Sequence, residues 1–245
     1  MGNDANGGTD LTEAGLAAID QLTDTPTNNF ATLNILDKAQ SSATYTEGNL
    51  KWSTVTAGHY FWARSTIGVS NGKWYFEAKL TSASSFNHIG ICDEGPADNT
   101  TSLESEVYAW EIKNSDGNVY NNESNSSYGD TFTTGDIIGV YLDLDNNKIY
   151  WAKNGTVQNS GTGVSITDPA STNTGNYFFC VTDNASGDNV TWEANFGNPS
   201  FAISSGNADA NGYGNFEYDP SSGTFDSASK DFLALCTKNL GSDGG

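Results

Sequence analysis

The chain has 245 residues, of which 36% are hydrophobic and 12% aromatic, and its 30 acidic and 10 basic residues give a formal net charge of −20. This length fits one all-β domain with extensions better than two full domains. The excess of negative charge repels phosphate backbones and anionic lipid surfaces, so the composition argues against nucleic-acid binding and against membrane binding. We expect the acidity to serve solubility, and a role that depends on cations is the alternative.

The cysteines and the first residues indicate the compartment in which the protein is made. Cys92, Cys180 and Cys236 show no Cys-x-x-Cys spacing, so the sequence indicates neither a disulfide framework nor a zinc site. Cys92 and Cys180 lie in apolar strand patterns and are expected to be small buried side chains. No apolar run reaches the roughly 18 residues of a membrane span, and Met1-Gly2-Asn3-Asp4 does not resemble a signal peptide. We therefore expect synthesis in a reducing cytoplasm and no membrane insertion.

Residues 1–24 are expected to form an N-terminal linker or extension. Residues 1–8 are rich in glycine and asparagine, whereas residues 11–22 repeat apolar side chains with a short helical period. The sequence therefore predicts a short helix or coil ahead of the main domain.

Two strand patterns follow the linker. Residues 43–55 predict a β-hairpin around the turn Glu47-Gly48-Asn49. Tyr60, Phe61 and Trp62 come next, and because successive side chains of a strand point to opposite faces, Phe61 should point away from both neighbours. We expect these rings to pack against a second sheet, with a rim position for one of them as the alternative.

Residues 135–155 carry the clearest pattern in the chain. Ile138, Val140, Leu142 and Leu144 recur with the two-residue period of a strand that has one face in a core. Residues 145–148 then read as a turn, and residues 149–153 as a second strand. This segment therefore predicts a β-hairpin.

The same segment resembles the signature hairpin of the SPRY (B30.2-like) domain. Five further motifs resemble parts of that family in the expected order, namely GKWYFEA at residues 72–78, HIGI at 88–91, DGNVY at 116–120, YGDTF at 128–132 and NFG at 195–197. The resemblance implies an all-β fold, a two-sheet antiparallel β-sandwich of the concanavalin-like jelly-roll type, over residues 25–201. We expect negligible helix after Leu22. Alternation in the matched strands predicts burial of six residues, Trp74, Phe76, Ile138, Val140, Leu142 and Trp192.

The segments at the two ends of the domain indicate the kind of protein that the chain belongs to. Residues 24–34 and 231–240 resemble the lead-in and the tail of SPRY-like virion proteins of tailed bacteriophages. This resemblance implies a virion protein made in the host cytoplasm. Residues 202–245 are expected to form a loop-rich C-terminal extension that aromatic side chains anchor on the sandwich, namely Tyr213, Phe216, Tyr218 and Phe225.

Two polar segments, residues 93–106 and residues 120–130, are longer than simple hairpin connections. The SPRY resemblance implies a partner-binding surface made by loops at one end of the sandwich. The candidate binding residues are Tyr120, Asn122 and Tyr128, with Asp93 and Glu94 nearby, because tyrosine offers stacking area and asparagine both donates and accepts hydrogen bonds. The alternative is that these tyrosines only pin their loops to the sandwich.

No catalytic residues are predicted. Residues 68–72 match the Gly-x-Ser-x-Gly pattern of a nucleophile elbow, but the residues that follow read as a strand where that motif needs a helix, so a turn is expected. His59 and His88 are not placed near a credible serine or cysteine by any motif. We expect both histidines to be structural.

Neither a cofactor nor a metal site is predicted. Asp143-Leu144-Asp145-Asn146-Asn147 resembles the opening of a calcium loop, but Lys148 and Asn154 stand where an EF-hand needs glycine and glutamate. A hairpin turn is expected there, with weak surface calcium binding as the alternative.

These observations predict a non-enzymatic recognition or structural module of a phage virion, in a tail fibre or another exposed virion protein. Its expected partners are a host-surface glycan or protein and other virion subunits, including further copies of itself. The second hypothesis is a cellular SPRY protein-interaction module that recognises a short peptide. The third is a glycan depolymerase, which would place two carboxylates about 5 to 9 Å apart beside a groove.

Overall fold

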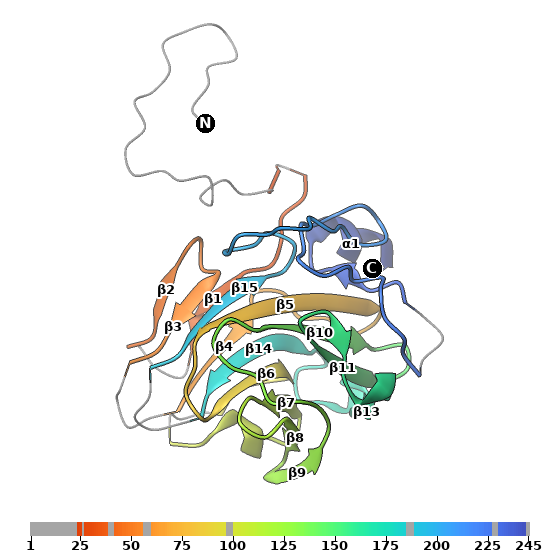
Figure 1. The fold of residues 1–245 in the computed structure, drawn as a ribbon. Helices are drawn as coiled ribbons and strands as arrows, with labels where there is room; N and C mark the ends of the chain where they lie inside the picture. Colours follow the sequence, from red (N-terminus) through yellow and green to blue (C-terminus); the bar gives the residue numbers. More distant parts are fainter. Residues whose placement is uncertain are drawn as a thin grey trace, which may run out of the picture.

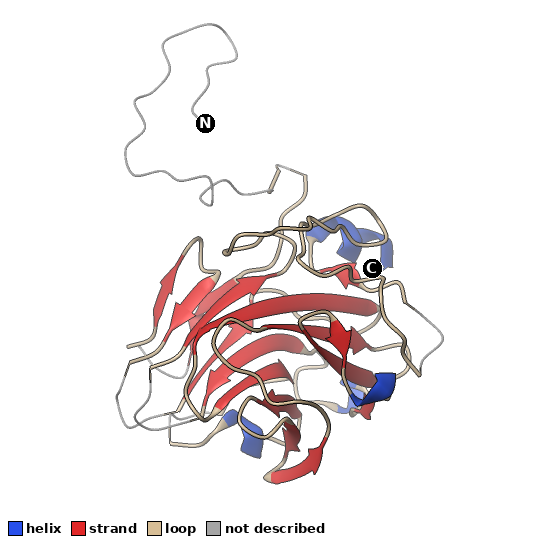
Figure 2. Ribbon diagram, in the orientation of Figure 1, coloured by secondary structure: helices blue, strands red, loops and turns tan. Residues whose placement is uncertain are grey.

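The computed structural model of the chain describes residues 24–25, 27–38, 42–55, 60–96, 100–184, 189–226 and 230–243. Two sheets pack face to face, and helix is confined to short segments (Figure 1, Figure 2). This confirms the predicted β-sandwich. None of the helices in these described ranges has the length and apolar character needed to cross a membrane.

The first sheet has seven strands. Their order in space is β1 (Leu33–Lys38), β4 (Phe61–Ser65), β14 (Phe178–Asp183), β6 (Asn87–Cys92), β7 (Ala109–Lys113), β8 (Asn118–Asn121) and β9 (Ser124–Ser127). All of these neighbours pair in the antiparallel sense. In this sheet β1 and β9 are the edge strands.

The second sheet has nine strands. The order is β12 (Thr156–Val157), β11 (Lys148–Lys153), β10 (Ile137–Asp143), β5 (Lys73–Ser82), β15 (Thr191–Asn195), β3 (Lys51–Ser53) and β2 (Thr44–Thr46), with β13 (Val164–Ser165) beside β11 and β16 (Leu233–Ala234) beside β5. The short helices are η2 (Leu103–Ser105), η3 (Asn159–Gly161), η4 (Pro169–Ser171) and α1 (Thr237–Asp243).

The main core lies between the two sheets. It forms because the alternating apolar residues of β5 and β10 face the same side, with Val140 opposite Phe76 and Leu142 opposite Trp74 in the ladder. The six residues whose burial was predicted are all buried, which confirms the register read from the sequence. The predicted hairpins at residues 43–55 and 135–155 are confirmed as β2–β3 and β10–β11.

Phe61 and Trp62 point to opposite faces of β4, as predicted. Phe61 belongs to the core between the sheets, whereas Trp62 belongs to a separate cluster with Cys92, Leu103, Ala109 and Cys180. Leu103 lies in η2, so this short helix packs over the outer face of the seven-stranded sheet. Cys92 and Cys180 are fully buried, which confirms their predicted role as small core side chains.

The two segments that match functional motifs in part, residues 68–72 and residues 143–147, contain turns. Gly72 has a φ of 80° and leads directly into β5, so residues 68–72 form no strand-to-helix elbow. Asp143 accepts hydrogen bonds from Asn146 through both carboxylate oxygens, and Asp143 faces Lys148 across the β10–β11 hairpin. Within the described ranges, no group of three or more His, Cys, Asp or Glu side chains is arranged to hold a metal ion.

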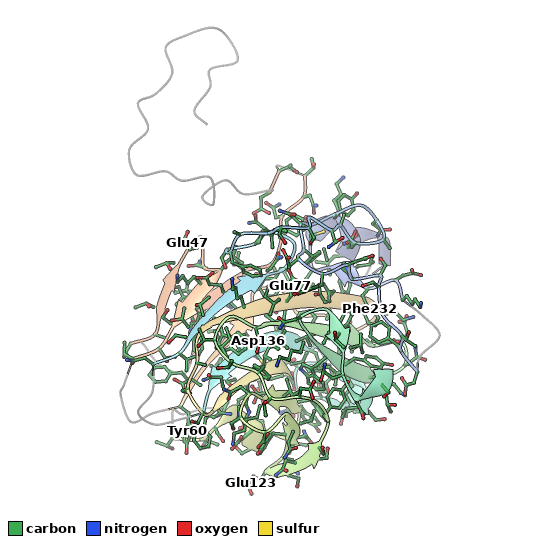
Figure 3. The ribbon with its side chains drawn as sticks, in the orientation of Figure 1. Glu47, Tyr60, Glu77, Glu123, Asp136 and Phe232 are labelled. Carbon is green, nitrogen blue, oxygen red and sulfur yellow. The ribbon has the colours of Figure 1, made fainter. Side chains whose placement is uncertain are left out.

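The C-terminal segment covers the outer face of the nine-stranded sheet. Three tyrosines project from that face, namely Tyr75, Tyr141 and Tyr150. They form a second buried cluster with Phe225 and Phe232, among others. Figure 3 shows Phe232 in this segment and Glu77 on the long strand β5. A second hydrophobic core therefore lies between the outer face of this sheet and the C-terminal segment.

Glu77 binds the backbone of that segment from within the sheet. Its Oε1 accepts hydrogen bonds from the Glu217 N–H and from Asn195 Nδ2, both at 2.8 Å. Its Oε2 accepts from the Tyr75 hydroxyl at 2.9 Å and from the Tyr218 N–H at 3.3 Å. Burial outweighs these bonds and raises the pKa of Glu77 from 4.5 to about 7.

The beginning and the end of the described sandwich are bonded to each other. The Asn29 N–H donates to Thr237 Oγ1, and the Thr237 N–H donates to the Asn29 carbonyl, both at 3.0 Å. Two details differ from the expectation of antiparallel sheets with negligible helix. β16 pairs with β5 in the parallel sense, and α1 is a seven-residue helix. The helix predicted over residues 11–22 lies outside the described residues.

Candidate partner-binding surface

Residues 120–130, expected to be a long loop, are a β-hairpin followed by a short return to the core. β8 and β9 pair from Asn118 opposite Ser127 to Asn121 opposite Ser124. Asn122 and Glu123 form the two-residue turn with φ angles of 49° and 61°, as the preferred hairpin turns require. The expectation of a loop is wrong here because all four β9 residues are polar and exposed, so no apolar alternation marks the strand.

The tip of this hairpin is bonded to the loop before β7. The Asn122 N–H donates to the Glu106 carbonyl at 3.3 Å, and the Glu123 N–H donates to the Glu104 carbonyl at 3.1 Å. Asn121 Nδ2 donates to the Val107 carbonyl at 2.8 Å. The two polar segments singled out in the sequence therefore meet at one end of the sandwich, where Figure 3 shows Glu123 at the tip.

A pocket of about 240 Å³ lies beside β9, and we call it the β9 groove. Its lining comes from β7, β8, β9 and β13 and comprises Trp110, Val119, Asn121, Ser124, Asn125, Ser126 and Val164. The Trp110 ring is held edge-on to Tyr177 with centroids 5.8 Å apart. The floor of the groove is therefore an apolar surface fixed by the main core.

A second pocket of about 270 Å³ is lined by Glu94, Glu106, Val107, Tyr108 and Asn173, and we call it the acidic pocket. Val107 is 52% exposed, so its side chain is accessible from the pocket. Burial, together with the charge of Glu94, raises the pKa of Glu106. The acidic pocket thus combines negative charge with an accessible apolar side chain.

Two of the predicted binding residues are inside the protein. Tyr128 packs edge-on against Trp151 with centroids 5.1 Å apart, and its hydroxyl accepts a hydrogen bond from the Trp151 N–H at 3.3 Å. Asp93 is fully buried and accepts from the N–H groups of Asn173 and Thr174 at 2.6 and 3.1 Å. The structure thus places neither side chain on the proposed surface, because each one holds a loop to the sandwich.

The other three predicted residues lie in three different places. Asn122 and Glu94 are exposed and lie at the hairpin tip and in the acidic pocket respectively. Tyr120 alternates with the groove residues of β8 and points to the opposite face, where its hydroxyl donates to Asp116 Oδ2 at 2.8 Å. Tyr120 therefore contributes to neither pocket.

The residues that line the β9 groove carry little sequence signal of a binding site. Trp110, Val119 and Val164 come from three separate segments, and each looks like an ordinary strand residue where it stands. The alternation of apolar side chains around Trp110 indicates a strand, but nothing in it indicates an opening beside that strand.

A buried cluster of titratable groups lies on the outer face of the seven-stranded sheet. His88 Nδ1 is 3.8 Å from Glu111 Oε2, and His88 Nε2 is 3.5 Å from Glu104 Oε2. Burial lowers the pKa of His88 to about 3 and raises the pKa of Glu111 to about 8, so both are uncharged at neutral pH. Both side chains are fully buried, so neither is positioned to reach a substrate. His59 lies outside the described residues.

An antiparallel sandwich with two pockets at one end, formed by loops and an edge strand, has the architecture of a binding domain. The model of the SPRY domain family matches residues 73–197, and the chain belongs to this family. The SPRY domain of human HERC1 has a similar structure, with a TM-score of 0.53 at 15% identity over 66% of this chain and 96% of that chain.

Curated relatives match this chain over short parts of much longer proteins. ATP-dependent RNA helicase DDX1 of Xenopus laevis is 34% identical over 94 residues, which is 38% of this chain and 12% of the helicase. Ran-binding protein 10 of Danio rerio is 32% identical over 108 residues, which is 43% of this chain and 17% of that protein. This chain thus spans less than a fifth of the length of these relatives.

Proposed function

We propose that this chain is a non-enzymatic interaction module and that it binds a protein partner at the end of the sandwich formed by the β9 groove and the acidic pocket. The observation that carries the proposal is the junction between the two pockets. Asn121 lines the groove, and its side chain is bonded to Val107, which lines the acidic pocket. A groove with both apolar and polar lining residues, next to an acidic and partly apolar pocket, suits a peptide segment and not a small anion.

The charge of this surface selects the kind of partner. Glu94, Glu104, Glu106 and Glu123 all lie in the acidic pocket or in the segments bonded to it. Their negative charge, within a chain of net charge −20, attracts basic segments and repels acidic ones. The partner segment is therefore basic, with apolar side chains that enter the pockets.

The test is selection of binders from a library of displayed random peptides. We expect enrichment of lysine and arginine, and binding that weakens as salt rises. The double variant Glu94→Gln and Glu106→Gln should weaken binding on the order of tenfold, at roughly 0.5 to 1 kcal/mol for each rim charge. Glu47→Gln on the β2–β3 turn is the matched control, and Figure 3 shows Glu47 far from Glu123. Selected peptides with no excess of basic residues, or equal affinity for all three proteins, would contradict the proposal.

The finer proposal is that the module belongs to a tailed-phage virion and binds a host-surface glycan or protein there. Its support is the resemblance of residues 24–34 and 231–240 to virion proteins. The similarity to Ran-binding protein 10 supports the alternative of a cellular module that recognises a short peptide. Mass spectrometry of purified virions separates the two, since a virion protein is present there at a fixed copy number and a cellular one only in the lysate.

One observation keeps a glycan depolymerase as a second candidate. Glu94 and Glu106 line one pocket, and the raised pKa of Glu106 would suit a general acid. Release of reducing ends from host polysaccharide, lost on Glu106→Gln, would support this candidate and overturn the non-enzymatic proposal.

A further inference from the structure

β9 differs from the other described strands that have a neighbour on one side only. β12, β13 and β16 have two residues each and β2 has three, and short edges of this kind offer little backbone for pairing. β1 is interrupted by a register shift between Leu33 and Lys38, and Asp37 within it is paired with Arg64. β9 has four residues without proline, charge or a register shift, and all four are exposed. It is the least protected edge among the described strands.

The register shows which backbone groups of β9 point outward. In a two-residue hairpin the residues that flank the turn form a hydrogen-bonded pair, and bonded pairs alternate with non-bonded pairs along the ladder. Asn121 and Ser124 flank the turn, so the backbone groups of Ser124 and Ser126 face β8. The N–H and C=O groups of Asn125 and Ser127 therefore face away from the sheet, where none of the described strands pairs with them.

The β9 groove lies on the inner face of this edge. Ser126 stands opposite Val119 in the ladder, and both line the groove with Trp110 beneath them. A strand added to β9 would direct every second side chain to this same face. An apolar side chain of such a strand would therefore reach Trp110 and Val164 without any rearrangement of the core.

Charge distinguishes the possible occupants of this edge. Glu123 stands at the turn end of β9, and its backbone is bonded to Glu104. A second copy of this chain would bring the same glutamate and a net charge of −20 to the contact, which is unfavourable. A basic segment of another protein would instead neutralise these carboxylates.

We propose that the protein partner binds as an extended strand added to β9, with an apolar side chain in the β9 groove and a lysine or arginine beside Glu123. This inference rests on the proposed function and specifies its mode. Main-chain hydrogen bonds to Asn125 and Ser127 give affinity, and the groove and the glutamates give specificity.

The test compares Asn125→Pro with Asn125→Ala. Both variants lose the hydrogen bond from Asn118 Nδ2 to the Asn125 side chain, but only proline removes the outward N–H. The probe is a short synthetic peptide of alternating valine and threonine with a lysine at each end, titrated into the ¹⁵N-labelled protein. We expect shifts of the Asn125 and Ser127 amides and of the Trp110 indole. Binding should weaken on the order of tenfold for Asn125→Pro relative to Asn125→Ala, the equivalent of one lost ladder bond.

A second measurement does not depend on folding of the proline variant. It compares two forms of the same peptide, each with N-methyl groups along one edge, on wild-type protein. The form methylated on the edge that meets β9 should not bind, whereas the form methylated on the other edge should bind. Equal affinity of Asn125→Pro and Asn125→Ala, or shifts confined to the acidic pocket, would overturn strand addition. If binding is then still lost in the Glu94→Gln and Glu106→Gln variant, the proposed function stands without this mode. A dimer that Asn125→Pro dissociates in sedimentation would identify a second copy as the occupant and overturn the proposal.

Discussion

Replacing Glu77 by glutamine tests whether a buried carboxyl group sets the pH dependence of folding. Glu77 lies in β5 beneath the C-terminal segment and accepts four hydrogen bonds, two of them from the backbone N–H groups of Glu217 and Tyr218. Such bonds favour the carboxylate, whereas burial favours the protonated acid. Burial is the larger effect, and the pKa rises from 4.5 to about 7.

The sign of the effect follows from proton binding. Between pH 4.5 and about 7 the folded protein holds the Glu77 proton and the unfolded chain releases it, so stability falls as the pH rises. The contribution is fully present below pH 4.5 and is lost by about pH 7, and it amounts to roughly 3 kcal/mol at about 1.4 kcal/mol for each tenfold change in proton affinity. Glu111, with its pKa raised to about 8, acts in the same direction. His88, with its pKa lowered from 6.5 to about 3, acts in the opposite direction below about pH 6.5, so the effect of Glu77 is read from the difference between the wild type and a Glu77 variant.

The assay is urea denaturation at several pH values from 4.5 to 8. Glutamine resembles the protonated acid but does not titrate, so Glu77→Gln should remove the part of the slope between pH 4.5 and 7 and leave the part due to Glu111. A variant with the slope of the wild type would show that Glu77 does not titrate in this range. Wild-type stability that rises with pH relative to that of Glu77→Gln would show that the hydrogen bonds outweigh burial and refute the reasoning.

Three further predictions concern the tyrosines, the C-terminal segment and metal. Tyr128→Ala should cost about 3 to 5 kcal/mol in urea denaturation because Tyr128 is buried against Trp151. Tyr120→Ala should cost within about 1 kcal/mol and leave selected peptides bound, since Tyr120 faces away from both pockets; loss of binding would contradict this placement. Phe232→Ala should cost about 3 to 5 kcal/mol because its ring is fully buried between Tyr141 and Phe225; a smaller loss would mean that the segment is weakly attached. Adding EDTA should leave the melting temperature unchanged, and a large drop would reveal a saturated calcium site.

The sequence predicted those parts of the fold in which one face of a strand is buried. The alternation from Ile138 to Leu144 was sufficient to orient β10, and the motif around Trp74 was sufficient for β5. β9 was missed because its residues 124–127 are all polar and exposed, so the strand is defined by backbone pairing with β8 and by the turn at Asn122 and Glu123. Side-chain periodicity carries no information about such an edge.

The candidate site was predictable only in part. The two polar segments do meet, and Asn122 and Glu94 lie at their junction. Tyr128 and Asp93 have the residue types of a binding surface but serve as buried anchors, because a polar group can be buried when its hydrogen bonds are made inside the protein. The β9 groove needs long-range contacts between β8, β9 and β13, and these do not exist until the chain has folded.

The bonding of Asn29 to Thr237 determines how this domain can be carried by a longer polypeptide. Both ends of the described sandwich therefore lie on one side of the molecule, and Figure 1 shows β9 on the opposite side. The domain can therefore be spliced into a surface loop of a host protein, or joined end to end with a short linker as a circular permutant, with little strain on the sheets. When the domain is inserted into a host loop, its points of attachment lie on the side of the sandwich away from the β9 edge.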